Sequence, residues 1–253
     1  MIIFKISAVI AIILAGVLGG LFPLRKTFAS GGRLALVLGN AFAGGVFLGA
    51  GLLHMMPDAI SDFEGLALAI DYPVPLLLAG VGFVLILAIE TLATKTATAD
   101  VIAKSGRFPV ILFVVLAIHS IIAGMSLGLE STLLNGVVIF VAIIAHKGSA
   151  SFSLGVNMVE AGVSRQVIKR TIFFFSTMTP LGIVAGSVLS AQTSAASAQV
   201  FEVVFDALAA GTFLYIATLE IIAELFSTSP KRLATLSVLL MGFALMATIA
   251  IWT

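Results

Sequence analysis

The fold of this chain is decided by two long apolar segments, FPVILFVVLAIHSIIAGMSLGLE (108–130) and LLNGVVIFVAIIAHKGSASFSLGVNMVE (133–160). Each is long enough to cross a bilayer as a helix, which advances about 1.5 Å per residue. His119-Ser120 lies near the middle of the first segment and His146-Lys147 near the middle of the second. Ionisable side chains at the midplane are costly and by default mark a site or a pathway. Two imidazoles at matching depth therefore suggest one shared ligand between the helices, a metal ion in transit.

The composition assigns the whole chain to the membrane class. Of its 253 residues, 60% are hydrophobic and 10% are charged, and the mean hydropathy is +1.23. These values exclude an ordinary soluble domain and indicate a polytopic membrane protein, with the lipid bilayer as its partner and no nucleic acid. Cysteine is absent, which excludes disulfides and a thiolate metal site.

Apolar runs bounded by charged or turn residues predict eight spans. They cover residues 4–24, 34–57, 74–94, 108–129, 136–158, 169–190, 203–225 and 233–252. Continuous runs of this length favour helices over the shorter, alternating strands of a membrane barrel. We therefore expect an all-α integral membrane protein of eight transmembrane helices. Because the connections are short, residues 1–253 are expected to form a single transmembrane domain.

The basic residues predict the orientation of the spans. Of the 13 lysines and arginines, 11 lie in alternate connections. These are Arg25, Lys26, Arg33, Lys95, Lys104, Arg107, Arg165, Lys169, Arg170, Lys231 and Arg232. The positive-inside rule puts those connections in the cytoplasm and both termini outside the cell or in another extracytoplasmic space.

Ionisable groups at other depths suggest a route through the bilayer. His54 and Asp58 are four residues apart, on one helix face, as two ligands of one cation would be, and so are Glu220 and Glu224. A cation that loses its water in hydrocarbon needs such ligands at each stage. The predicted transport pathway runs inward through His54, Asp58, Asp206, His119, His146, Lys147, Glu90, Glu220 and Glu224. Taken singly, each has a simpler interpretation, such as an interfacial histidine or a carboxylate that reaches water.

The central residues bear on the identity and number of ions. Neutral imidazole favours Zn²⁺ and its neighbours over Mg²⁺ or Ca²⁺, although a lone buried histidine is more often a hydrogen-bonded core residue. Lys147 needs an acidic partner or a water-filled cavity, and no acid neighbours it in the sequence. Its fixed charge should oppose a second metal ion close by.

A family resemblance is carried by six fragments, which occur in order at transmembrane spacing. They are AFAGGVFLGAGLLHMMPD (41–58), GFVLILAIET (82–91), HSIIAGMSLG (119–128), HKGSASFSLG (146–155), MTPLGIVAG (178–186) and GTFLYIATLE (211–220). They resemble spans two to seven of the ZIP (Zrt-/Irt-like) family of divalent metal transporters, and within it the subfamily with HS and HK motifs in the fourth and fifth spans.

The resemblance implies a ZIP-like helix bundle with eight spans and both termini outside. It also implies uptake of Zn²⁺, or of Cd²⁺, Fe²⁺ or Mn²⁺, as the transported substrate towards the cytosol, by displacement of one helix bundle against another, and it suggests a homodimer. We expect no catalytic cofactor and a multi-pass location in the plasma membrane or a bacterial inner membrane.

Some residues differ from the two-metal members that the chain resembles. Ser120 and Lys147 fall where those members have metal ligands, and Ala123 and Ala150 fall where they have bridging glutamates. The resemblance therefore implies a single central ion, held by His119 and His146 and by Ser120, water or a carboxylate.

Two rival functions must be considered. The string Gly124-Met-Ser126-Leu-Gly128 matches G-x-S-x-G, and an intramembrane serine hydrolase would use Ser126 with His146. This motif needs a strand–turn–helix context, which an apolar helical run does not offer. A coupled carrier of a small organic solute is the other alternative, but it would not require a pair of imidazoles. We therefore predict a transporter and not an enzyme.

Overall fold

The computed structural model describes residues 1–25, 33–68, 70–95, 107–191, 195–229 and 231–252. Within these ranges, eight helical segments are long and apolar enough to cross a membrane, and the described secondary structure is helical, without strands. The prediction of an all-α, eight-span membrane protein is therefore confirmed. Lys26 and Lys104, two of the basic residues used to predict the orientation, lie outside the described residues.

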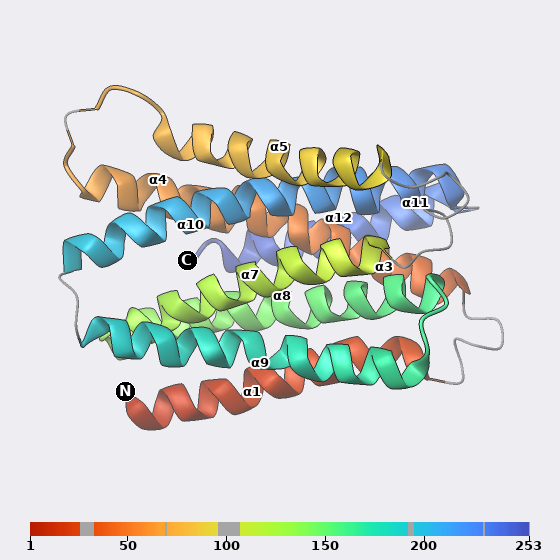
Figure 1. The fold of residues 1–253 in the computed structure, drawn as a ribbon, viewed down its shortest axis with the longest axis horizontal. Coiled ribbons are helices and arrows are strands. Elements are labelled where there is room, and N and C mark those ends of the chain that lie inside the picture. The colour runs from red at the N-terminus through yellow and green to blue at the C-terminus, as the bar shows by residue number, and fades with distance from the viewer. Residues whose placement is uncertain (26–32, 69, 96–106, 192–194, 230, 253) are drawn as a thin grey trace.

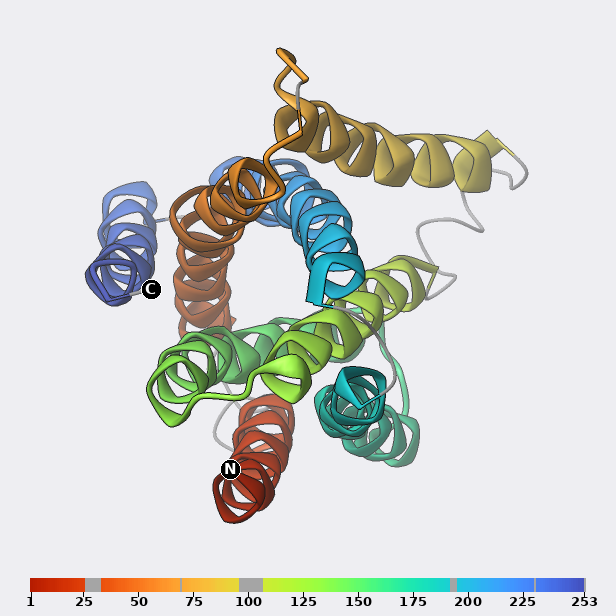
Figure 2. The same cartoon turned by 90° about the vertical axis from the view of Figure 1, so that its left-hand side faces the viewer.

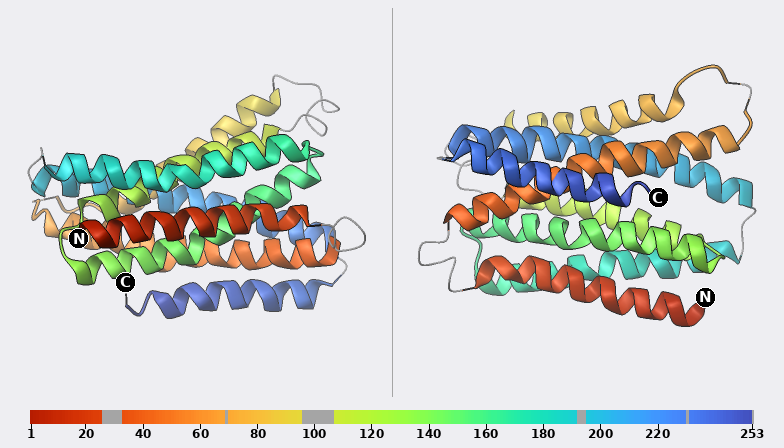
Figure 3. Two further views of the ribbon diagram at one scale, coloured as in Figure 1. Left: turned by 90° about the horizontal axis from the view of Figure 1, so that it is seen from below. Right: turned by 180° about the vertical axis from the view of Figure 1, so that it is seen from behind.

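Several spans consist of more than one consecutive helical piece. The segments are α1 (Ile2–Leu21) with η1 (Phe22–Leu24), α3 (Arg33–Ala50) with η2 (Gly51–Met55) and α4 (Met56–Gly65), α5 (Val74–Lys95), α7 (Arg107–Leu129), α8 (Leu133–Glu160), α9 (Arg165–Ser190), α10 (Ala195–Tyr215) with η3 (Ile216–Ile222) and α11 (Ala223–Thr228), and α12 (Arg232–Ile249). Neighbouring spans run antiparallel, and both ends of the chain lie toward the same end of the bundle (Figures 1 and 3).

Two spans widen locally into a π-helix, η2 and η3. The cause at η2 is Pro57, whose ring would clash with the carbonyl of Leu53 in a regular α-helix and which has no N–H to donate. The wider winding relieves this clash, and the N–H of Met56 bonds to the carbonyl of Gly51. Such π segments occur often at functional sites, and η2 carries His54.

The predicted ends of two spans were wrong. The second span continues to Gly65 instead of ending at residue 57, and the seventh begins at Ala195 instead of residue 203. Both extensions are polar, so a hydropathy criterion excludes them, but the two helices stabilise each other beyond the apolar region. The Gln199 side chain, for example, donates a hydrogen bond to the carbonyl of Asp62 over 3.0 Å.

The helices form two groups, which the end-on view of Figure 2 shows side by side. The first group contains α1, α7, α8 and α9, and the second contains α3–η2–α4, α5, α10–η3–α11 and α12. Contacts within each group are extensive, whereas the groups meet mainly where α3 packs on α8 and α10 packs on α7. The side chains of α1, α5 and α12 that face outward are largely apolar and form a surface suited to lipid.

Glycine allows the closest contacts within a group. A Cβ atom at Gly182 of α9 would collide with the carbonyl oxygen of Ile121 on α7, and one at Gly124 would collide with that of Thr179. In the second group, a Cβ at Gly242 of α12 would collide with the carbonyl of Phe42 on α3. Close backbone approach is how helices associate in lipid, where no hydrophobic force drives them together.

We predict that Gly182→Ala destabilises the protein by about 1–3 kcal/mol, because the backbone of α7 cannot move away from the added methyl group without losing its own packing. Gly80→Ala is the matched control, since a Cβ at Gly80 meets nothing within 4 Å. Thermal stability of the two purified variants, followed by size-exclusion chromatography after heating, tests this. Equal melting midpoints would contradict the proposed role of the glycine contact.

Candidate functional site

The structure brings the two central histidines together at the interface of α7 and α8. His119 and His146 are 5% and 4% exposed, and their Nε2 atoms lie 3.2 Å apart. Their Nδ1 atoms have no hydrogen-bond partner among the described residues. In lipid an unsatisfied polar atom is costly. The two Nε2 atoms, in contrast, are close enough to share one proton or to bind one cation together.

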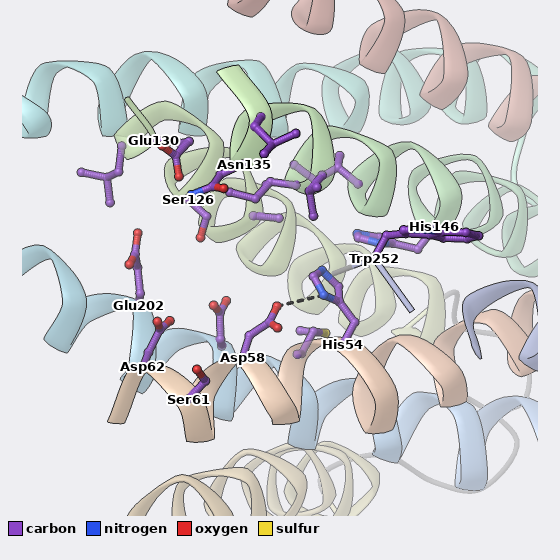
Figure 4. Close-up of a pocket in the computed structure, with 18 of the residues that line it drawn as sticks. His54, Asp58, Ser61, Asp62, Ser126, Glu130, Asn135, His146, Glu202 and Trp252 are labelled. Atoms are coloured by element: carbon purple, nitrogen blue, oxygen red, sulfur yellow. Dashed lines mark ion pairs between the residues drawn. The ribbon is translucent and has the colours of Figure 1, made fainter. Parts of the chain in front are cut away.

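A cavity of about 960 Å³ extends to these histidines from Glu130 and Ser190, at the end of the bundle where the two termini lie. Figure 4 shows His146 together with several polar residues that line the cavity. Four helical segments form most of its wall: η2–α4, α7, α8 and α10. The polar residues that line it are His54, Asp58, Ser61, Asp62, His119, Ser126, Glu130, Ser131, Asn135, His146, Ser190, Glu202 and Asp206. The first and second helix groups thus enclose a polar hollow in an otherwise apolar bundle.

The outer residues predicted from the sequence lie in this cavity. His54 Nδ1 is 2.8 Å from a carboxylate oxygen of Asp58, which is the one-face arrangement expected of residues four apart. Asp206 of α10 lines the same hollow. These side chains place carboxyl oxygens between the cavity mouth and the two imidazoles.

Glu130 adds a fixed negative charge at the cavity mouth, between α7 and α8. Its carboxylate accepts hydrogen bonds from the backbone N–H groups of Ser131 and Thr132, at 2.7 and 2.6 Å. Partial burial by itself raises the pKa of Glu130, but the hydrogen bonds from Thr132 and Ser131 outweigh it and hold the pKa below its ordinary value. The group is therefore ionised at neutral pH.

Lys147 is 2% exposed and is satisfied in a way that the sequence did not reveal. Its ammonium donates hydrogen bonds to Ser120 Oγ at 3.0 Å and to the carbonyl oxygen of Phe175 at 3.2 Å. The same atom lies 3.7 Å from the centroid of the Phe175 ring, within the range of a cation–π contact. The expectation of an acidic partner or a water-filled cavity was therefore wrong, because a hydroxyl, a carbonyl and an aromatic face supply the interactions.

Ser120, predicted as a third metal ligand, accepts that hydrogen bond from Lys147 and does not line the cavity. Its ligand role stays a prediction. Among the described residues, no three His, Asp or Glu side chains are grouped closely enough to hold a metal ion together. An ion at the two imidazoles would therefore complete its coordination with water or with a side chain that moves.

The inner carboxylates lie apart from the cavity. Glu90 of α5 accepts a hydrogen bond from the hydroxyl of Tyr215, and Glu220 in η3 lies close enough to Glu90 for a side-chain hydrogen bond. Glu224 follows one turn later, in α11. All three stand in the second helix group, on the opposite side of the two histidines from the cavity mouth.

The structure adds cavity residues that the sequence analysis did not select. The clearest example is Glu202. The sequence could have indicated it, because Glu202 lies four residues before Asp206 and therefore on the same face of α10. Asn135 and Ser61 carried no such signal. Trp252 also borders the cavity. Ser126 lines the cavity as well, but it lies inside the continuous helix α7, without the strand–turn–helix context of a hydrolase nucleophile.

Fold and site together define a polytopic helical membrane protein with a polar cavity that ends at a buried pair of imidazoles. The model of the family described as "ZIP Zinc transporter" matches residues 2–109 and 100–250. The chain therefore belongs to the ZIP family, as the sequence fragments suggested.

Curated proteins similar to this chain agree with that assignment. Zinc transporter ZIP1 of Mus musculus is 31% identical over 288 aligned positions, which cover 96% of this chain and 89% of ZIP1. Zinc transporter ZIP1 of Danio rerio is 29% identical, with 96% of each chain covered. Zinc transporter ZIP2 of Homo sapiens is 27% identical, with 87% of this chain and 86% of ZIP2 covered.

Proposed function

We propose that this chain carries a divalent transition metal ion, Zn²⁺ above all, across the membrane into the cytosol. The proposed site lies between His119 and His146. The observation that carries the proposal is the position of two facing Nε2 atoms at the inner end of a cavity lined with carboxylates. Relatives that align with nearly the whole chain are named zinc transporters, which supports the choice of metal.

The spacing of the two nitrogens suits this ion. Zn–N bonds of about 2.0–2.1 Å in a tetrahedral site put two nitrogens roughly 3.3 Å apart. The Nε2 atoms are 3.2 Å apart, so both rings can bind one ion with little movement. The larger Ca²⁺ and the strongly hydrated Mg²⁺ prefer oxygen ligands, and two neutral imidazoles do not compensate them for lost water.

The outer carboxylates supply the route of entry. Asp58, Asp62 and Asp206 line the cavity outward of the imidazoles, and negative groups in a cleft with apolar walls raise the local concentration of cations. Each can replace part of the water shell before the ion reaches the centre. Because basic residues gather in the opposite connections, the cavity mouth is assigned to the extracytoplasmic side.

Lys147 accounts for a single ion at the centre. Its ammonium is fixed by Ser120 and Phe175 beside His146, so the space next to the imidazoles already holds one positive charge. The two-metal members of the family that this chain resembles have bridging glutamates at the positions of Ala123 and Ala150. A second divalent ion would meet repulsion without an anion to offset it.

The two helix groups suggest how the ion passes through. Glycine contacts make each group internally rigid, and the proposed ligands His119 and His146 both belong to the first group. On the inner side the groups are joined by a buried hydrogen bond from Ser153 Oγ on α8 to Asn40 Oδ1 on α3, at 2.9 Å. Displacement of the first group along the second would expose the site to the cytosol, towards Glu90, Glu220 and Glu224.

We predict that His119→Ala and His146→Ala each lower Zn²⁺ flux into proteoliposomes by at least roughly tenfold, because one imidazole cannot replace the lost water shell. Val138→Ala, which changes the cavity wall without removing a ligand atom, should retain its flux. Size-exclusion profiles establish that each variant folds. Undiminished flux in either histidine variant would refute the central site, and a set of competing metals in the same assay ranks the substrates.

A second prediction concerns the number of ions. Crystals soaked in Cd²⁺ should show one anomalous peak between His119 and His146, because the ammonium of Lys147 repels a second ion. Two strong peaks at the centre would contradict this.

A third prediction concerns the cavity mouth. Asp58→Asn should raise the Zn²⁺ concentration that gives half-maximal uptake severalfold and leave the maximal rate nearly unchanged, because the neutral amide attracts the cation less. Asp71→Asn, outside the cavity, is the matched control. If both variants keep the parent's half-maximal concentration, Asp58 is only a solvated surface residue.

A further inference from the structure

One aromatic side chain contacts both central imidazoles from the opposite helix group. Phe213 of α10 is fully buried, and its ring centroid lies 4.2 Å from that of His119 and 6.0 Å from that of His146. On another side its ring meets Phe47 of α3 at 5.0 Å, and Phe47 is also fully buried. Phe213 therefore contacts α7 and α8 of the first helix group and α3 of its own group.

No other pair of rings in contact joins the two helix groups in the part of the chain that the structure describes. Phe113 stacks on Phe174 inside the first group, and Phe83 meets Tyr215 inside the second. The two contacts that cross the boundary both end on Phe213. This ring thus lies where the group that carries the imidazoles meets the group that would stay still during transport.

The cavity ends at the level of Phe213. His119 and His146 line it, whereas Phe213 does not. One to two turns further along the same span, Ile216, Ala217 and Ile221 are buried in the large apolar core, of which Phe213 is also a member. An apolar ring at such a point excludes water and hydrated ions, as hydrophobic constrictions do in channels.

We propose that Phe213 is the inner seal of the central site. Its ring closes the route between the cavity and the inner half of the bundle. The same ring contacts the His119 and His146 rings on their inner side and holds them in place. Phe47 supports it from within the same group, so the seal stays with the second group. Displacement of the first group removes the imidazoles from the ring, and the site then loses its inner closure. The role of the seal in ion passage rests on the proposed function, whereas the closure itself concerns water access.

The absence of cysteine allows a direct measurement, because any introduced thiol is the only one in the chain. An Ala217→Cys reporter stands one turn inward of Phe213, and an Ala123→Cys reporter stands in the cavity wall. A membrane-impermeant cationic methanethiosulfonate is added to membrane vesicles, without metal, on the side from which the Ala123→Cys reporter reacts.

With Phe213 intact, the Ala217→Cys reporter should react slowly. Phe213→Ala should raise its rate several-fold, because removal of the ring lets water and reagent pass the imidazoles. Phe213→Leu, which restores most of the apolar volume, should bring the rate back towards that of the parent. Leu127→Ala is the matched control. It removes a similar side-chain volume at a fully buried position, in a smaller apolar cluster that Leu127 forms with Ala8, Ile12, Ile143 and Ile183.

An unchanged reaction rate in Phe213→Ala, with the Ala123→Cys reporter still labelled, would overturn the proposal and leave Phe213 as ordinary core packing. An equal rise in Leu127→Ala would also overturn it, as a sign of general loosening. If size-exclusion shows that Phe213→Ala does not fold, Phe213→Val takes its place with the same expected direction. Because labelling needs no metal, loss of the proposed Zn²⁺ transport and loss of the seal are separate results.

Discussion

The facing contact between the Nε2 atoms of His119 and His146 is the interaction on which the rest of this structure depends. At 3.2 Å the two nitrogens need a shared proton or a shared cation, because two lone pairs at that distance repel each other. The helices therefore have to hold both rings in one fixed relation, and α7 and α8 do so from within a single helix group.

The same group also holds a buried lysine. Lys147 follows His146 directly, yet its ammonium turns away into contacts with Ser120 and Phe175. These partners are neutral, so they stabilise the amine without adding the opposite charge that an acidic residue would supply. When Lys147 is protonated, its positive charge lies beside the site proposed for a divalent ion and opposes a second ion at the centre.

Several functional features of the bundle lie on the boundary between the two helix groups. The cavity, the imidazole pair, Phe213 and the bond between Ser153 and Asn40 all lie on it. Within each group, by contrast, close glycine contacts leave little room for change. The boundary therefore combines polar side chains with a lack of the close glycine–backbone contacts that occur within each group.

The sequence by itself determined the number of spans and the membrane class, because the exclusion of charge from hydrocarbon acts on each segment separately. It also predicted that His119 and His146 share a depth, since depth follows from counting residues along a helix. Only the tertiary structure decided which side chains meet. The polar extension to Gly65, the place of Glu202 in the cavity wall, the partners of Lys147 and the ring of Phe213 beneath the imidazoles all depend on contacts between segments far apart in the chain. Hydropathy and spacing describe one helix at a time, whereas these contacts depend on how neighbouring helices are rotated and how closely they approach.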